Sequence, residues 1–240
     1  MKKIQKSSEL LWLFGIVFVA LGVAICSKAD LGVSMIAAPA FVVQEAIAHI
    51  SPVLTVGVTE YIIQGLLLVV LCIVVGRFNW RYLLAFAVAV IYGYVLDFFM
   101  WLLGGVELNA VWMRWVMLFV GDVVTAFGVA CFFRTYMPLQ VYELFVAELA
   151  DRFHIPIIKV KRVFDITLLV LSALLAVVLF WDVAAFDWTT IGYASFHSIG
   201  LGTIVTTIIN SPLIALMGKV ADRFFGTKPA FPRMEQILKR

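Results

Sequence analysis

The sequence predicts an all-α polytopic membrane protein with six transmembrane helices and two short re-entrant or interfacial helices. Of its 240 residues, 64% are hydrophobic and 14% are charged, and the mean hydropathy is +1.06. An average soluble domain carries roughly 25% charged residues, so this chain has about half of the charge that a wetted surface needs. Apolar stretches of helical length recur along the chain, and a pattern in the first half returns in the second half. We therefore expect lipid to cover most of the surface.

Six apolar runs are long enough to cross a bilayer, which takes ~20 helical residues. They cover residues 10–27, 56–75, 82–103, 115–133, 163–181 and 198–217. Two further runs, 33–48 and 139–150, are shorter and contain acidic residues. Their length and their acids favour helices that enter the membrane without crossing it. Backbone that turns at such a depth is tolerated only when it is buried in protein or lines a wet cavity.

The lysine and arginine residues supply an orientation, because cytoplasmic loops are enriched in them. With six crossings and a cytoplasmic N-terminus, Lys28 and Arg114 are the only two of the 18 cations on the outer side. Eight crossings would instead move Arg77, Arg81 and Arg134 to the outside. The distribution favours six crossings, with both the N- and the C-terminus in the cytoplasm.

The first and fourth long runs share a pattern of small residues. Residues 11–24 align with residues 117–130. Identical residues occupy Gly15/Gly121, Val17/Val123, Ala20/Ala126, Gly22/Gly128, Val23/Val129 and Ala24/Ala130. Each stretch is followed by a cation, a turn, a short run and two long runs. Because each half then crosses three times, the second half must be inverted relative to the first.

The sequence thus predicts an inverted 3+3 repeat. Its halves are residues 1–110 and 111–218, and a short basic cytoplasmic tail, 219–240, follows them. Secondary transporters commonly use this architecture, with the ligand site near the membrane midplane at the repeat interface.

A cation stands six residues after an aligned glycine in each half. Lys28 follows Gly22, and Arg134 follows Gly128. A helix start buried in the membrane offers free N–H groups and a partial positive charge, which attract anions. One hypothesis is therefore a site for a small anion or carboxylate at Lys28 and Arg134. The alternative is that both cations snorkel at helix ends.

Two aspartates, Asp97 and Asp122, lie near the centres of long runs. A charge at that depth costs about 2.5–3.5 kcal/mol on insertion scales, so each must face the bundle or a cavity, or be protonated. They are predicted either to form a proton or cation site, or to make a structural hydrogen bond to Thr125 or to a tyrosine such as Tyr92.

Further polar residues are candidates for lining a substrate site. They are Glu60 and Gln64 in the second long run, Gln140 and Glu143 in the second short run, and Thr203 and Asn210 in the last long run. Tight helix packing and architectural ion pairs, such as Arg162 with Asp165, are the alternative. Pro212 lacks a backbone N–H, so the last run is predicted to kink or unwind near Asn210.

Several classes of protein are not expected from this sequence. No acid, base and nucleophile converge at one predicted depth, which argues against an enzyme. The three cysteines lack the spacing of metal ligands, so no metal and no other cofactor is expected. The cations cluster at segment ends, so they give no nucleic-acid signal. No G-x-x-x-x-G-K-[ST] motif occurs, so any energising ATPase would be a separate subunit.

Four motifs resemble the YczE/YyaS/YitT family of bacterial membrane proteins. They are G-V-A…K-A-D-L-G-V-S, P-L-Q-V-Y-E-L, K-V-K-R-V-F-D and G-L-G-T…N-S-P-L-I. Together they extend over most of the chain, although Ser211 replaces the usual glycine before the late proline. The resemblance implies a multi-spanning, transporter-like protein of the bacterial plasma (inner) membrane, without a settled substrate.

The sequence as a whole predicts a small secondary transporter or exporter of a polar or anionic metabolite. Its expected partners are the lipid bilayer and a small-molecule or ion substrate, with a homo-oligomer or an energising partner subunit left open. One alternative is a non-transporting membrane partner or regulatory subunit of a larger complex. Another is the substrate-binding membrane component of an importer.

Overall fold

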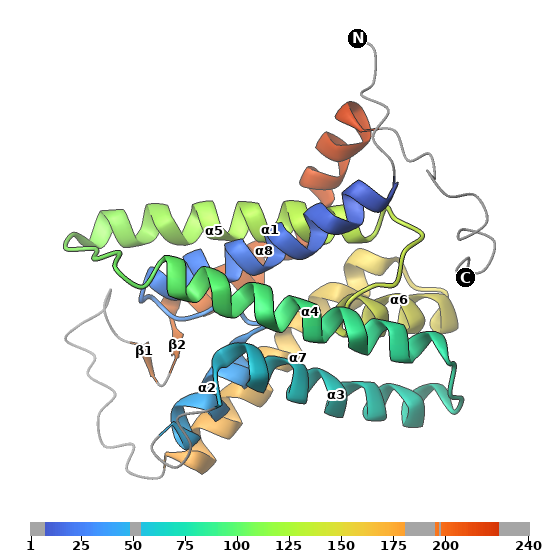
Figure 1. The fold of residues 1–240 in the computed structure, drawn as a ribbon, viewed down its shortest axis with the longest axis horizontal. Coiled ribbons are helices and arrows are strands. Elements are labelled where there is room, and N and C mark those ends of the chain that lie inside the picture. Colours follow the sequence, from blue (N-terminus) through green and yellow to red (C-terminus); the bar gives the residue numbers. More distant parts are fainter. Residues whose placement is uncertain (1–7, 49–53, 181–194, 197, 226–240) are drawn as a thin grey trace.

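The computed structural model describes residues 8–48, 54–180, 195–196 and 198–225, and this part of the chain is all-α apart from one small hairpin (Figure 1). Its long helices are α1 (Ser8–Lys28), α3 (Val56–Val75), α4 (Arg81–Leu102), α5 (Val111–Phe132), α7 (Ile157–Leu179) and α8 (Leu201–Phe224). The short helices are α2 (Ala38–Ile47) and α6 (Val141–Phe153), and the strands are β1 (Ser195–Phe196) and β2 (Ile199–Gly200). The six long helices are the ones long and apolar enough to cross a membrane, which confirms the predicted fold class.

One end of the bundle carries Arg77, Arg81, Arg134 and Arg152, and we call it the arginine-rich end. Here the start of α1 meets the segment after α5, because the hydroxyls of Ser8 and Thr135 are 2.9 Å apart. Arg134 pairs with Asp222 near the end of α8. Arg77, just beyond α3, pairs with Glu148 of α6 at 3.4 Å. The starts of α1 and α4 and the ends of α3, α5 and α8 therefore share this end.

The opposite end holds the other helix termini. The Nζ of Lys28 donates to the carbonyl of Gly104, which follows α4, and Arg114 of α5 pairs with Asp30 at 2.6 Å. The Gly202 N–H at the start of α8 donates to the Leu31 carbonyl. Helix α1 ends here, and α3 begins here as well, because Thr55 and Gly57 bond to Asp97 near the end of α4, so α2 does not cross the bundle. Likewise, the chain leaves the arginine-rich end after α5 and returns to it through α6, so α6 does not cross the bundle either.

Helices α1 and α5 form the tightest contact, and four glycines make it possible. A Cβ added to Gly22 would lie 2.6 Å from the Gly121 carbonyl oxygen, and one added to Gly128 would lie 3.1 Å from that of Gly15. Rising residue numbers in α1 meet falling numbers in α5, so the two helices are antiparallel. We call these four residues the glycine seam. Small residues allow such close backbone approach between membrane helices, where van der Waals packing drives association.

The remaining contacts fall into corresponding sets. Helix α3 packs on α4 as α7 packs on α8, and α4 packs on α1 as α8 packs on α5. The short helices each contact a long helix of the other half, α2 against α7 and α6 against α3. Figure 1 shows α6 beside the far end of α3 and α2 towards the other end of the bundle.

Helix α8 corrects one expectation about the last apolar run. It is continuous from Leu201 to Phe224 and contains Pro212 in its interior. The helix is therefore not unwound at Asn210, and it extends past the end predicted from hydrophobicity. A proline removes only one main-chain hydrogen bond, which neighbouring helices and side chains can compensate within a bundle.

Candidate functional site

Lys28 and Arg134 lie at opposite ends of the bundle. The Lys28 Nζ contacts the Gly104 carbonyl at 3.4 Å, whereas the Arg134 Nε and Nη2 donate to Asp222 at 2.6 and 2.8 Å. Both cations stand at the C-terminal ends of antiparallel helices, which places them far apart. The expectation of a paired anion site is corrected by this geometry, and each cation instead closes a local contact at a helix end.

Asp97 lies towards the end of the bundle opposite the arginine-rich end, and it caps α3. Its Oδ2 accepts a hydrogen bond from the Thr55 Oγ1 at 2.6 Å, and its Oδ1 accepts from the Gly57 N–H at 2.8 Å. A carboxylate at a helix N-terminus satisfies free N–H groups and complements the helix dipole. The structure thus gives Asp97 a structural bond, although to other partners than Thr125 or Tyr92.

Thr203 also makes structural hydrogen bonds. Its Oγ1 accepts from the Gly200 N–H at 3.2 Å, and its carbonyl accepts from the hydroxyls of Thr206 and Thr207. The residue is fully buried in the first turn of α8. These bonds order the start of the helix.

The other six predicted site residues lie in the interior together with two charged residues of α7. We call these eight side chains the buried polar network. They are Glu60, Gln64, Asp122, Gln140, Glu143, Lys161, Asp165 and Asn210, and each is at most 1% exposed. They come from α3, α5, α7, α8 and the start of α6. Charged side chains this deep in a bundle of apolar helices mark substrate, ion or proton pathways by default.

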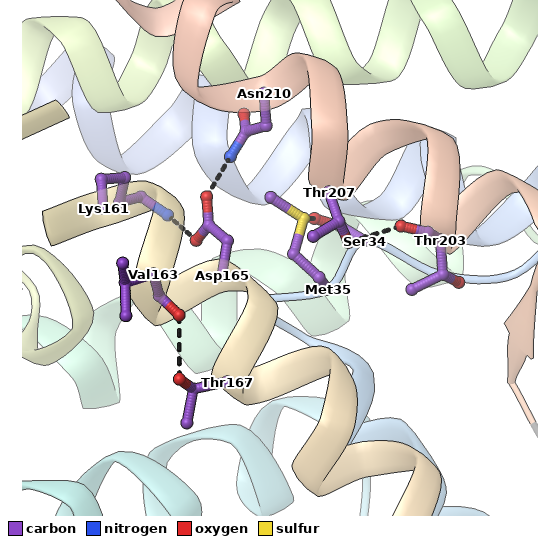
Figure 2. Close-up of polar contacts among 9 residues, drawn as sticks. All are labelled: Ser34, Met35, Lys161, Val163, Asp165, Thr167, Thr203, Thr207 and Asn210. Atoms are coloured by element: carbon purple, nitrogen blue, oxygen red, sulfur yellow. Dashed lines mark hydrogen bonds and ion pairs between the residues drawn. The ribbon is translucent and has the colours of Figure 1, made fainter. Parts of the chain in front are cut away.

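Lys161 and Asp165 form the ion pair of the network. They are one turn apart on α7, and both side chains are fully buried. The Asn210 Nδ2 donates to the other Asp165 oxygen at 3.3 Å, which joins α8 to α7 (Figure 2). The Lys161 Nζ also lies 5.9 Å from the centre of the Phe164 ring, within the range of a cation–π contact.

Two acids of the network, Glu60 of α3 and Glu143 of α6, interact electrostatically. The Tyr142 hydroxyl donates to Glu60 at 2.9 Å, and the charge of Glu143 also acts on Glu60. The charges of Lys161 and Asp165 act in turn on Glu143. They act on Asp122 as well, so the acids of both halves are electrostatically connected.

The charges of the network do not balance. Four carboxyl groups stand against a single ammonium group, that of Lys161. A dry interior cannot hold three uncompensated negative charges, because each costs several kcal/mol to desolvate. Some of these carboxyl groups must therefore hold protons or meet a bound cation or water. Within the described residues, no three His, Cys, Asp or Glu side chains come together as metal ligands would.

Many polar atoms of the network have no hydrogen-bond partner among the described residues. They are Glu60 Oε1, Gln64 Oε1 and Nε2, Asp122 Oδ2, Gln140 Oε1, Glu143 Oε2 and Asn210 Oδ1, and Ser211 Oγ beside them shares this property. Buried polar atoms in folded proteins are nearly always paired. A concentration of unpaired atoms indicates a place where water, protons or a polar ligand bind.

Sequence reasoning assigned Asp165 to a structural pair with Arg162, and the functional candidate that it missed in the buried polar network is the actual partner, Lys161. It stands between Lys159 and Arg162, and a basic cluster before an apolar run is typical of a cytoplasmic loop. Helix α7 begins at Ile157, so Lys161 is already in its second turn and its side chain points inward. The available signal was the acid one turn later, because Lys161 and Asp165 have the spacing of a helical ion pair.

A cavity of about 570 Å³ opens at the arginine-rich end, and we call it the vestibule. The turn after α3, the start of α4, the segment after α5 and α6 line it. Tyr82 and Ala85 line it from the buried face of α4, which continues to Tyr92. Tyr92 is within electrostatic range of Glu60 and Glu143. The vestibule therefore lies along the face of α4 that leads to the network.

These features define a polytopic helical membrane protein with a charged, incompletely paired interior. The chain matches a family of unknown function, DUF6198, over residues 6–219, and it belongs to that family. No curated protein and no solved structure matches it. The relation to the YczE/YyaS/YitT family stays a prediction.

Proposed function

We propose that the protein is a small secondary transporter of a polar metabolite, and that the buried polar network carries protons as its coupling ion. The single observation that carries this proposal is the unbalanced charge at the centre of the bundle. Four carboxyl groups and one lysine are buried there, and several of their atoms lack partners within the described residues. A purely structural interior would not retain this costly set, because well-packed apolar residues are often as stabilising.

The arrangement of the two halves supports alternating access. Gly15 and Gly22 correspond in sequence to Gly121 and Gly128, and each glycine of one pair approaches a glycine of the other. The corresponding helix contacts of the two halves extend the same relation. We infer an inverted repeat of residues 1–110 and 111–218, in which rocking of one half against the other exposes a central site alternately.

Equivalent acids of the two halves face the network. Glu60 and Asp165 are as many residues apart as His49 and His154, which mark matching positions in the two halves. Glu60 is bonded to Tyr142 of the second half, and Asp165 is bonded to Lys161. We propose that a proton resides on one or the other acid according to which side of the membrane the site faces.

The arginine-rich end is the proposed cytoplasmic end, in the inner membrane of a bacterium. Arg77, Arg81, Arg134 and Arg152 lie there, and cytoplasmic loops carry such an excess of cations. In a background without the three native cysteines, Asn109→Cys should react with an impermeant thiol reagent added to whole cells, and His154→Cys should not. Both side chains are exposed. Reaction of His154→Cys alone would reverse the orientation.

Proton-coupled flux tests the proposed function. The purified protein is reconstituted into liposomes with an entrapped pH-sensitive dye, and small carboxylates, amino acids, phosphate and polyols are added in turn. A substrate should produce a change of internal pH in the parent protein. Glu60→Gln should abolish this signal while the variant still elutes as a single species and melts cooperatively, since the amide keeps the size of the side chain.

Glu107→Gln is the matched control, because Glu107 is exposed in the loop between α4 and α5. It should transport as the parent does. Undiminished flux in Glu60→Gln would contradict the coupling role of the network. Silence of the folded parent protein across the whole panel would contradict transport and return the protein to the class of non-transporting membrane partners.

A further inference from the structure

We propose that the vestibule is a binding site for an anionic group, a carboxylate or a phosphate, with Arg77 and Tyr82 as its principal donors. The identification of this anion as part of the transported substrate rests on the proposed function. The volume of about 570 Å³ lies within the range of small-molecule pockets, ~300–1,000 Å³. Neither Lys28 nor Arg134 lines this cavity.

The charge of the vestibule favours an anion. Three arginines, Arg77, Arg81 and Arg152, line it together with two acids, Glu148 and Asp151. Its lining is therefore net positive before His154 is counted. Guanidinium groups bind carboxylates and phosphates through two parallel hydrogen bonds, which makes arginine the preferred cation for such ligands.

Two of these arginines use only part of their N–H donors in the contacts described below. The Arg152 Nη1 donates to the Val75 carbonyl at 2.6 Å and thereby completes the last turn of α3. The Arg77 Nη2 contacts Glu148 at 3.4 Å, and the Arg77 side chain remains 70% exposed. Each contact engages one nitrogen of a group that carries five N–H donors. Arg152 is thus committed to the fold, whereas the contact of Arg77 with Glu148 is a long ion pair at the surface.

Tyr82 supplies the second, independent observation. Tyr82 is 1% exposed and lines the vestibule, but its hydroxyl forms no hydrogen bond of good geometry with any described residue. The ring packs edge-on against Phe78, and both Arg77 and Glu148 are close to the hydroxyl. A buried hydroxyl without a well-formed hydrogen bond is costly, so its position beside the Arg77–Glu148 pair points to an acceptor that Glu148 replaces only in part.

Glu148 occupies the place that the ligand would take on Arg77. An entering anion would accept hydrogen bonds from the Arg77 guanidinium and the Tyr82 hydroxyl, and it would displace the Glu148 carboxylate. Glu148 is mostly buried, with 15% of its side chain exposed, so it cannot move far into solvent. It therefore acts as an internal competitor that weakens anion binding. This competition predicts opposite effects for variants of neighbouring residues.

Equilibrium binding to the full-length protein tests the proposal. The protein is placed in nanodiscs of zwitterionic lipid, and succinate and inorganic phosphate are titrated as probes by calorimetry and by thermal stability. At least one probe should bind. Arg77→Gln should weaken it about tenfold or more, and Tyr82→Phe should weaken it several-fold, because each removes a donor to a charged group. Glu148→Gln should strengthen it.

Control experiments distinguish an anion site in the vestibule from a site at Arg134 and from binding of a lipid headgroup. Arg134→Gln should leave binding unchanged, because Arg134 is paired with Asp222 outside the vestibule. Unchanged affinity in both Arg77→Gln and Tyr82→Phe, or no binding of either probe by the folded protein, would overturn the site. A second set of nanodiscs contains anionic lipid. Binding of the anionic headgroup in place of both soluble probes would overturn the assignment to a soluble substrate.

The same measurements distinguish this inference from the proposed function. Glu60→Gln should still bind the probes, since Glu60 does not line the vestibule. Probe binding without any proton-coupled flux would therefore refute the transport proposal alone. Flux that survives in Arg77→Gln with unchanged affinity would refute only the vestibule.

Discussion

The glycine seam and the buried polar network are both buried, but they are built in opposite ways. In the seam, backbones touch, and the hydroxyl of Thr125 is satisfied by the Gly121 carbonyl at 2.9 Å. In the network, long polar side chains fill the space between helices, and most of them retain an unpaired atom among the described residues. The residues of the glycine seam serve close packing. The polar residues of the network are not needed for packing, so they point to a chemical role.

This difference indicates which contacts of the molecule resist deformation and which can change their protonation and their hydrogen-bond partners. Close-packed interfaces resist small deformation, because every displacement costs many van der Waals contacts. A network with unpaired atoms and excess acid can exchange protons and partners at a lower cost. We therefore propose that the close contact between α1 and α5 is the pivot on which the two halves rock, and that the protonation of the network biases this motion.

Removal of the single cation should test the network most severely. Lys161→Met is expected to lower the free energy of unfolding by about 3–5 kcal/mol, because it leaves Asp165 charged and unpaired in the interior. The loss should shrink as the pH falls, since protonated Asp165 needs no counter-charge. Denaturation in mixed micelles at several pH values measures this effect.

The double variant Lys161→Met/Asp165→Leu is the matched control for that experiment. It should recover much of the stability, because an apolar pair of similar volume replaces the buried ion pair. A single variant that unfolds at the same denaturant concentration as the parent at neutral pH would show that the pair is dispensable.

A small change in the seam should cost less, but it should be independent of pH. Gly22→Ala places a Cβ 2.6 Å from the Gly121 carbonyl oxygen, so the helices must separate. Overpacking of this kind costs about 1–3 kcal/mol. Gly105→Ala is the control, because a Cβ at that position meets nothing within 4 Å. Equal melting temperatures of the two variants would contradict the seam as a close-packed pivot.

Asp97 belongs with the structural contacts, in spite of its charge. Asp97→Ala should cost about 0.5–2 kcal/mol, the usual range for a lost helix cap. Thr55→Ala should add little to it, because both residues serve the same cap. Proton-coupled flux should remain in both variants. Loss of flux in a stable Asp97→Ala protein would return this residue to the transport site.

The sequence predicts the six long apolar helices well because length and hydrophobicity are local properties. The two short helices follow from the same reasoning, since their acids and their length oppose a full crossing. Glu60, Asp122 and Glu143 could also be expected in the interior, because an isolated acid in an apolar run must avoid lipid. None of this requires knowledge of which helices touch.

The failures concern residues whose environment depends on long-range packing. Lys161 is indistinguishable from its basic neighbours until the start of α7 is known. The pairing of Lys28 with Arg134 ignored that an inverted repeat carries equivalent helix ends to opposite sides. Tyr82 offered no sequence signal at all, because an unpaired hydroxyl is visible only when its surroundings are.

The smallest effect is expected where the sequence suggested the most chemistry. Arg134 forms a bidentate pair with Asp222, but Asp222 is 58% exposed, and such surface pairs contribute about 0–1 kcal/mol. Arg134→Gln should therefore shift the melting temperature slightly, and high salt should remove most of the difference, since exposed charges are screened. The variant should bind succinate or phosphate as the parent does, whereas Arg77→Gln should not. If Arg134→Gln instead abolished anion binding in a folded protein, the site would lie at the end of α5, and the division between paired surface cations and the vestibule would fail.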